Sequence, residues 1–469
     1  MTLLSLRCSA AEILSELGAG RMSCAELMQA TLDRIAAVNG TVNAIVALRQ
    51  RDDLLVAARA ADSVALAERG PLHGLPVAVK DLVNVRGIVT SHGSPIFREA
   101  VAGADDLVAA RMRTAGAIPI GKTNVPEFGL GSHTFNPVYG ATANPYAPAR
   151  SCGGSSGGAA VALATGMVTL ADGSDMMGSL RNPAAWNNVY GFRPSWGRVP
   201  SEPVGDTFLH QLATLGPMAR SPADIAILLD VMSGPDPRQP HGMVCEPVAP
   251  LAGVDMKGKR IGWLGDWGGA FAMEEGIPEQ SEAALRVMQD LGAQVEPVAP
   301  PFDASAIWQS WTDLRSWAVA ASLAPLMVRQ ADLKDSAVWE IERGMALTAI
   351  QVHRASEIRS GWFRRAAALF DDYDALVLPS AQVWPFDLAL PWPTEIAGRG
   401  MDTYHRWMEV MVPVSLIGLP CLALPAGFGA AGLPAGIQLF GRRGSDAALL
   451  ALGEAYHAAT GWPQKRPAM

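Results

Sequence analysis

Strand-like runs alternate with helix-like segments along most of this chain, and this alternation limits the possible fold more than any other feature. The run Leu-Pro-Val-Ala-Val-Lys at 75–80 predicts a buried strand, helical spacing follows at 106–115, and 117–120 predicts another strand. A helical pattern at 161–167 and a strand at 168–171 repeat this order. Such alternation is typical of layered proteins. The predicted fold class is therefore α/β.

The two ends of the chain extend the pattern. Helical spacing from 9 to 66 predicts two or three helices, one of them capped by Ser23 with Glu26 at its third position. The segment 303–370 is mostly helical and rich in tryptophan, and we interpret it as a lid or wall beside a site. Three further strands and a closing helix are predicted at 375–379, 421–425, 435–439 and 446–459.

These elements predict one domain over residues 1–469. Its parts would be N-terminal helices (1–66), a core that carries the chemistry (67–200), a variable helical segment on the substrate side (300–370) and closing strands with a helix (410–469).

Composition and charge exclude several classes of protein. Apolar residues make up 49% of the chain and charged residues 17%, which predicts a large buried core and little disorder. The net charge of -8, without a run of Lys and Arg, argues against nucleic acid as a ligand. The five cysteines are scattered and lack CxxC spacing, so we expect neither a disulfide framework nor a metal site. Charged residues interrupt 1–30 and no long apolar run occurs, so we expect a cytoplasmic protein without a membrane span.

Two glycine-flanked serine loops are the candidates for chemistry. The first, Cys152-Gly-Gly-Ser-Ser-Gly-Gly158, runs into a small apolar helix pattern, so its hydroxyl and N–H groups can face an anion or a reacting carbonyl. The second contains Ser179 after a predicted strand, a position that can expose a nucleophile beside backbone donors, although it lacks the GxSxG pattern. The alternative for the first loop is a flexible turn, and the second, taken alone, could equally be a structural turn.

Lys80 supplies a base for these serines. Neither loop contains a histidine, which argues against a Ser-His-Asp triad, whereas Lys80 ends the predicted strand at 75–80. A buried lysine can accept a proton when desolvation or a neighbouring positive charge lowers its pKa towards neutrality. A lone lysine at a strand end is more often a surface charge. The combination with two serine loops nevertheless favours Ser–Lys chemistry.

The segment 116–123 also satisfies the Walker A pattern GxxxxGK[ST]. Its four middle residues are the apolar strand itself and include a proline, whereas a phosphate-binding loop needs flexible residues with free N–H groups. We therefore interpret this match as a coincidence.

Several motifs together resemble the amidase signature hydrolases over nearly the whole chain. They are Gly70-Pro-Leu-His-Gly-Leu-Pro-Val-Ala-Val-Lys-Asp81, Gly121-Lys-Thr-Asn-Val-Pro-Glu-Phe128, the loop Gly153–Gly158, Gly418-Leu-Pro and Gly432-Leu-Pro-Ala-Gly-Ile-Gln-Leu439. The order and spacing of Lys80, Ser155 and Ser179 also agree. The resemblance implies a central mixed β-sheet with helices on both faces.

By this resemblance, Ser179 attacks the carbonyl and Ser155, held by a cis peptide after Gly154, passes the proton between Ser179 and neutral Lys80. An acyl-enzyme forms and water releases it, so neither a metal nor an organic cofactor is implied. The implied activity is hydrolysis of amide-like C–N bonds in amides, anilides or carbamates, with esters as further substrates.

The resemblance also assigns the loop before the nucleophile. Its oxyanion hole would consist of the backbone N–H groups of Met176, Met177, Gly178 and Ser179. Asp175 and Arg181 match positions that brace this loop, with ordinary loop charges as the alternative. The pair Met176-Met177 departs from the small residue and glycine common in the family, and it is similar to a branch that includes metagenomic urethanases.

Tryptophans in the helical segment favour an aromatic substrate, although core packing is their commoner role. They are Trp308, Trp311, Trp317, Trp339 and Trp362. We expect a small-molecule amide or carbamate substrate, no nucleic-acid or membrane partner, and a monomer or homodimer. One alternative is the glutaminase component of a tRNA-dependent amidotransferase, against which Met176-Met177 and the aromatic content argue. The other is a non-catalytic binding paralogue, against which the presence of all three proton-transfer residues argues.

Overall fold

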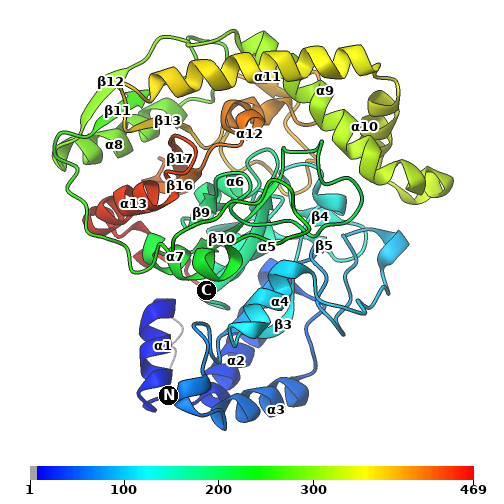
Figure 1. Ribbon diagram of the computed structural model, residues 1–469, viewed down its shortest axis with the longest axis vertical. Coiled ribbons are helices and arrows are strands. Elements are labelled where there is room, and N and C mark those ends of the chain that lie inside the picture. Colours follow the sequence, from blue (N-terminus) through cyan, green and yellow to red (C-terminus); the bar gives the residue numbers. More distant parts are fainter. Residues whose placement is uncertain (1–7) are drawn as a thin grey trace.

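The computed structural model describes residues 8–469, and its largest sheet joins strands from both ends of the chain (Figure 1). In spatial order its strands are β1 (Ile45–Val46), β3 (Ile118–Thr123), β2 (Pro76–Lys80), β8 (Leu170–Asp175), β10 (Thr214–Ala219), β9 (Tyr190–Arg193), β16 (Cys421–Phe428), β17 (Pro434–Phe440), β13 (Ala375–Pro379), β11 (Arg260–Trp263) and β12 (Gln294–Pro297). Strand β2 pairs in parallel with β3 and β8, whereas β10 is antiparallel to both of its neighbours. The predicted α/β fold with a mixed sheet is confirmed.

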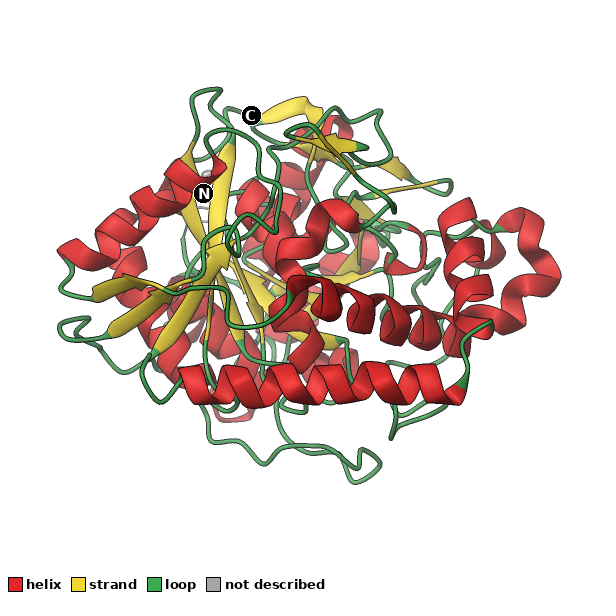
Figure 2. Ribbon diagram, turned by 90° about the horizontal axis from the view of Figure 1, so that it is seen from above, coloured by secondary structure: helices red, strands yellow, loops and turns green. Residues whose placement is uncertain are grey.

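The sheet separates two apolar cores. In β13, Ala375 and Val377 pack in one buried cluster, whereas Leu376 and Leu378 pack in the other. Successive side chains of a strand point to opposite faces, so helices have to cover both sides of the sheet. Figure 2 shows the strands in the interior with helices around them.

Different helices cover the two faces. One face contacts α7 (Pro222–Met232), α8 (Ile277–Asp290) and α13 (Asp446–Thr460). On the other, α6 (Arg181–Trp186) contacts β9, β16 and β17, and α12 (Val412–Ile417) contributes to the same cluster. Helix α5 (Gly157–Ala164) contacts β2, β3 and β8 and brings the first serine loop to the sheet.

The sequence predicts two or three N-terminal helices, and the structure has three: α1 (Ala10–Gly18), α2 (Cys24–Val42) and α3 (Arg51–Asp62). Ser23 and Glu26 form the predicted capping box of α2, each side chain accepting the other's backbone N–H. The predicted helix at 106–115 is α4 (Leu107–Thr114) with Asp106 at its N-cap.

The segment 303–370 is helical as predicted: α9 (Ala304–Leu323), the 3₁₀ helix η5 (Ala324–Asp332), α10 (Asp335–Met345) and α11 (Ala349–Leu369). Figure 1 shows α11 across the top of the molecule and α9 with α10 at one side. Trp311 and Trp362 are fully buried in the cluster shared with α6 and α12. The segment is therefore a packed wall of the core, and these two tryptophans are core residues.

Two parts of the sheet differ from the sequence prediction. The strand predicted at 168–171 is β8, which begins at Leu170 and continues through Gly173 and Ser174 to Asp175. The reason is long-range, because β10 pairs with all six residues of β8 and holds them extended. The strands β1, β9, β10, β11 and β12 and the helices α6, α7 and α8 were not predicted from the sequence.

The remaining elements are short. They are β4 (Phe135–Asn136), β5 (Gly140–Ala141), β6 (Ala143–Asn144), β7 (Ala147–Ser151), β14 (Glu395–Ile396) and β15 (Arg399–Gly400), with 3₁₀ helices η2 (Leu66–Glu68), η3 (Pro95–Phe97), η4 (Glu127–Gly129), η6 (Arg406–Met411) and η7 (Trp462–Gln464). Over residues 8–469, no helix has the length and apolar character needed to cross a bilayer.

Candidate active site

Lys80 lies at the C-terminal end of β2, as predicted, with its side chain fully buried. Its Nζ lies 2.8 Å from Ser155 Oγ, 2.9 Å from Ser156 Oγ and 2.9 Å from Ser174 Oγ. Ser155 and Ser156 come from the loop that enters α5, and Ser174 comes from β8 beside β2. The amine is thus surrounded by hydroxyl groups rather than by carboxylates.

Burial lowers the pKa of Lys80 to about 7, although Asp172 and Asp175 oppose this shift. Asp172 Oδ1 accepts a hydrogen bond from the backbone N–H of Lys80 at 2.9 Å. This carboxylate therefore holds the end of β2 and not the side-chain amine of Lys80. A neutral amine has two N–H groups and one lone pair, so one of three surrounding hydroxyls has to donate to Nζ. Lys80 is therefore placed to take a proton from a serine.

The first serine loop is held by hydrogen bonds across the site. The Gly154–Ser155 peptide bond is cis. The hydroxyl of Thr134 donates to the carbonyl of Gly153 at 2.8 Å, and the N–H of Gly154 donates to Asn182 Oδ1 at 3.3 Å. These contacts hold the backbone that leads into Ser155.

Ser179 follows β8 and precedes α6. Its carbonyl accepts the N–H of Ser156 at 3.2 Å, which joins the two serine loops. Ser155, Ser174 and Ser179 line the same cavity of 160 Å³, whose other lining residues are Leu82, Phe128, Gly129, Leu130, Gly131, Ser132, Met176, Met177, Ala213, Arg315 and Met408. The structure thus brings the three predicted residues Lys80, Ser155 and Ser179 to one site.

Asp175 and Arg181 form a buried ion pair at the base of the loop that carries Ser179. Arg181 donates from Nε and Nη2 to the two carboxylate oxygens, both at 3.0 Å, and Arg193 Nη1 lies 3.1 Å from Asp175 Oδ1. Burial alone would raise the pKa of Asp175, but the two arginines hold it well below its usual range. The N–H of Leu180 also donates to Asp175, at 3.2 Å. Asp175 therefore ties both ends of the turn together.

One of the four expected oxyanion donors is already used. The N–H of Gly178 donates to Asp175 Oδ1 at 2.9 Å, because the turn folds back over the carboxylate at a Gly178 φ of 84°. The N–H groups of Met176, Met177 and Ser179 donate to no acceptor in the part of the chain that the structure describes. The expectation is corrected accordingly, from four available donors to three.

Several residues of the site were missed by the sequence analysis. Ser174 could have been found, since it is a further serine between the predicted strand at 168–171 and Ser179. Arg193 and Arg315 carry no local signal, because only folding brings them to the loop. Arg315, on α9, pairs with Glu340 through Nε at 2.6 Å and places Nη1 3.3 Å from Met176 Sδ in the cavity wall.

The five tryptophans singled out from the sequence do not line this cavity, to which Phe128 contributes the aromatic ring. The Walker-like residues also lie elsewhere. Lys122 is inside β3 with a buried side chain that donates to the carbonyl of Val83, so the segment forms a strand and not a phosphate-binding loop.

Comparisons with known proteins find similarity over nearly the whole chain. The family model described as Amidase matches residues 26–450. The chain is 32% identical to an acylamidase of Rhodococcus erythropolis, covering 98% of this chain and 97% of that protein. It is 34% identical to a glutamyl-tRNA(Gln) amidotransferase component of Chloroflexus aurantiacus, covering 96% of each.

A solved structure extends the comparison to the fold. The crystal structure of a bacterial aryl acylamidase of the amidase signature family superposes with a TM-score of 0.91 at 29% identity, covering 98% of this chain and 99% of that one. The chain belongs to the amidase signature family, whose members hydrolyse carbon–nitrogen bonds of amides.

Proposed function

We propose that this chain cleaves amide-like C–N bonds through an acyl-enzyme on Ser179, with Ser155 as proton relay and Lys80 as base. The observation that carries the proposal is the buried Nζ of Lys80, 2.8 Å from Ser155 Oγ, with its pKa lowered to about 7. A base of this pKa can take up a proton and return it within one turnover at neutral pH. Ser179 lines the same cavity as Ser155 and is linked to that loop through its carbonyl.

In the acylation step, Ser179 Oγ attacks the substrate carbonyl carbon. Its proton passes to Ser155 Oγ, whose own proton passes to neutral Lys80 Nζ. The C–N bond then breaks as the leaving nitrogen takes a proton from Ser155, which recovers one from Lys80. Water attacks the acyl group through the same relay and releases a carboxylic acid from an amide, or a carbonic acid monoester from a carbamate.

The backbone N–H groups of Met176, Met177 and Ser179 would stabilise the negative charge that develops on the carbonyl oxygen. Removing one such donor typically costs about 3 kcal/mol in the transition state. Asp175, Arg181 and Arg193 act as positioning residues, since they hold the turn that presents these donors and touch no reacting atom.

The narrower proposal is an aryl amidase or urethanase, and an adjoining cavity supports it. This cavity of 190 Å³ shares Leu130, Gly131 and Ser132 with the catalytic cavity. Its aromatic wall is formed by Phe135, Trp392, Tyr404 and Trp407. If an aromatic group of the substrate occupies this adjoining cavity, the scissile bond lies near Ser179. The similarity to an acylamidase and an aryl acylamidase supports the same substrate class.

A second candidate activity is glutamine hydrolysis, which the 34% identity to a glutamyl-tRNA(Gln) amidotransferase component favours. Free glutamine carries a carboxylate and an ammonium group, for which Lys334 and Asp335 in the lining of the adjoining cavity offer opposite charges, whereas an aromatic amide would use its aromatic wall. The two candidates therefore make opposite predictions for aromatic amides and for glutamine.

The test compares wild type and Ser179→Ala on 4-nitroacetanilide, on an alkyl N-(4-nitrophenyl)carbamate and on glutamine. The two aromatic substrates release the same 4-nitroaniline, so the leaving group is constant. We expect cleavage of at least one aromatic substrate by the wild type and loss of that activity in Ser179→Ala, with circular dichroism to show that the variant folds.

The outcomes separate the candidates. Carbamate turnover at or above the anilide rate supports a urethanase, and cleavage of the anilide alone supports an aryl amidase. Ammonia release from glutamine, with neither aromatic substrate cleaved, would replace the proposal by the glutaminase. Inactivity of the folded wild type on all three, or unchanged activity in Ser179→Ala, would overturn the catalytic role of Ser179.

A further inference from the structure

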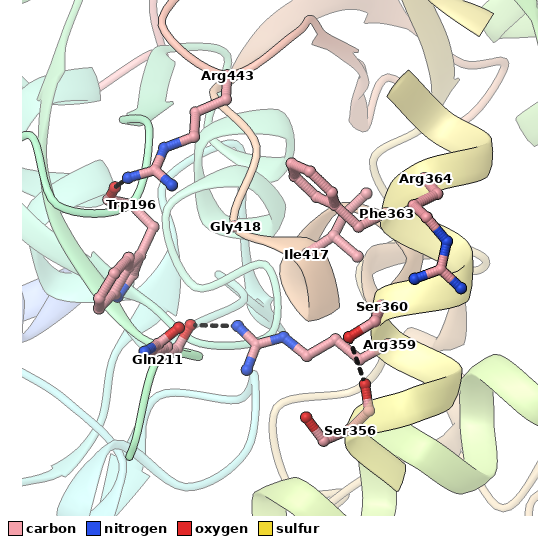
Figure 3. Close-up of a pocket in the computed structure, with 10 residues that line it drawn as sticks. All are labelled: Trp196, Gln211, Ser356, Arg359, Ser360, Phe363, Arg364, Ile417, Gly418 and Arg443. Atoms are coloured by element: carbon pink, nitrogen blue, oxygen red, sulfur yellow. Dashed lines mark hydrogen bonds between the residues drawn. The ribbon is translucent and has the colours of Figure 1, made fainter. Parts of the chain in front are cut away.

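A third cavity, of 310 Å³, lies between α11 and the loops that follow β9, α12 and β17 (Figure 3). It shares no lining residue with the catalytic cavity. Its lining residues are Trp196, Gln211, Ser356, Arg359, Ser360, Phe363, Arg364, Ile417, Gly418 and Arg443. Nothing in the proposed hydrolysis uses this cavity.

The lining of the cavity is cationic. It contains three arginines and no Asp or Glu. Figure 3 shows Arg359 entering from α11 and Arg443 from the opposite side, whereas Arg364 points away from both. Arg359 Nη2 donates to the carbonyl of Gln211 at 3.0 Å and Arg443 Nη2 donates to the carbonyl of Trp196 at 3.3 Å. Each guanidinium keeps further N–H groups for another acceptor.

These positive charges lack carboxylate partners. Within residues 8–469, Arg359, Arg364 and Arg443 form no ion pair, in contrast to Arg260, which pairs with Glu296 at 3.1 Å. Burial, together with repulsion from Arg193, lowers the pKa of Arg359 to about 10, so it is still cationic at neutral pH. A partly buried cation without a counter-charge is costly, and a bound anion would offset that cost. The chain as a whole is acidic, with a net charge of -8, so this pocket is a local exception.

The pocket also offers an apolar surface. The side chains of Trp196, Phe363 and Ile417 line it beside the arginines. Phe363 is 38% exposed although it is a large apolar residue. A volume of 310 Å³ exceeds the need of a bare inorganic anion and suits a small organic molecule. Guanidinium groups recognise carboxylate and phosphate oxygens through paired N–H donors.

We propose that this cationic pocket, defined by Arg359, Arg443, Trp196 and Phe363, binds a small organic anion outside the catalytic cavity. The anion is a carboxylate or a phosphate monoester with an apolar body. Its charged group lies between Arg359 and Arg443, and its body packs on Trp196 and Phe363.

Calorimetric titration of the full chain tests this site with benzoate, phenylphosphate, inorganic phosphate and neutral benzyl alcohol at matched ionic strength. We expect saturable binding of at least one organic anion at concentrations up to about 10 mM, and none of benzyl alcohol. Whichever of benzoate and phenylphosphate binds more tightly identifies a carboxylate or a phosphate ligand. Inorganic phosphate binding as tightly as the organic anions would overturn the apolar part of the site.

Substitutions of arginines inside and outside the pocket show where the organic anion binds. Arg359→Gln and Arg443→Gln should each weaken it at least about tenfold, the loss expected for a charge-assisted contact. Arg354→Gln is the matched control, because Arg354 is an exposed arginine on the same helix outside the pocket, and it should change binding less than about twofold. Arg443 is exposed, so its variant keeps the test valid if Arg359→Gln misfolds. No saturable binding of either organic anion, or unchanged binding in the folded pocket variants, would overturn the proposal.

Discussion

At the scale of single residues, the site depends on how one lysine and its neighbouring hydroxyls are buried. The sequence identifies Lys80, Ser155 and Ser179 as candidates, but it does not contain the desolvation that lowers the pKa of Lys80 to about 7. That shift arises because β2, β8 and the loop before α5 together exclude water from the amine. Residue type alone would leave Lys80 charged.

The pH dependence of kcat/KM should follow the protonation of Lys80. Below about pH 7, Lys80 is protonated and cannot accept the serine proton, so kcat/KM should rise about tenfold per pH unit and level off above that pH. Initial rates on the better 4-nitroaniline substrate, from about pH 5.5 to about pH 9, measure this profile. Lys80→Met should abolish the rising limb along with most of the activity. A wild-type profile without a limb near neutrality would contradict Lys80 as the base.

Ser155 and Ser156 form a matched pair, because their hydroxyls lie 2.8 Å and 2.9 Å from the same nitrogen. If Ser155 relays the proton, Ser155→Ala should lower kcat by about 100-fold or more, the usual size of a lost proton-transfer step. Ser156→Ala should lower kcat less than about tenfold, since Lys80 keeps its contacts with Ser155 and Ser174. Steady-state kinetics of both variants provide the comparison, and equal losses would show that the assignment of the relay is wrong.

At the scale of elements, local patterns predict where a helix begins better than where a strand ends. The capping box of Ser23 and Glu26 and the N-cap at Asp106 are local, and both helices begin where predicted. Strand β8 is longer than predicted because its last residues are held by β10, which lies far along the chain. This difference matters to the site, since it places Ser174 on a strand beside Lys80.

The contact between α5 and β3 can be tested at Gly158. A Cβ at this position would lie 2.3 Å from the backbone nitrogen of Asn124, so only glycine allows the close approach. Gly158→Ala should therefore destabilise the protein by about 1–3 kcal/mol. Gly361, in the middle of α11, is the control, because a Cβ there meets Phe302 at an ordinary 3.5 Å.

Gly361→Ala should stabilise the protein by about 0.5–1 kcal/mol, since alanine favours a helix more than glycine does. Urea unfolding followed by circular dichroism measures both variants. The same sign of change in the two variants would contradict the close packing of α5 on β3.

At the scale of the whole molecule, the sheet brings distant segments to one site. Arg181, which holds the loop that carries Ser179, also lies beside Gln438 of β17 and donates to the carbonyl of Met411 at 3.3 Å. The segment α9–α11 packs against the same side of the sheet, where Trp362 Nε1 donates to the carbonyl of Pro413 at 2.8 Å. The helical segment α9–α11 is therefore continuous with the core of the molecule.

Substitutions of two tryptophans in the segment α9–α11 distinguish a packed wall from a mobile lid. Trp362 is fully buried, so Trp362→Ala should lower the free energy of unfolding by about 3–5 kcal/mol. Trp339 is 37% exposed, and Trp339→Ala should lower the free energy of unfolding by less than about 1.5 kcal/mol. Thermal and urea unfolding of both variants measure the difference. A change in KM without loss of stability in Trp362→Ala would indicate a lid instead.

The sequence by itself determined the α/β class, the helical character of 303–370, the strand that carries Lys80 and the identity of the two serine loops. These features depend on local periodicity, on capping residues and on motifs that resemble a known family. Only the tertiary structure decided that Ser156 and Ser174 surround Lys80, that the N–H of Gly178 donates to Asp175, and that the buried tryptophans are core residues. The reason is physical, because burial, hydrogen-bond partners and pKa values belong to the packed environment of a residue and not to its place in the chain.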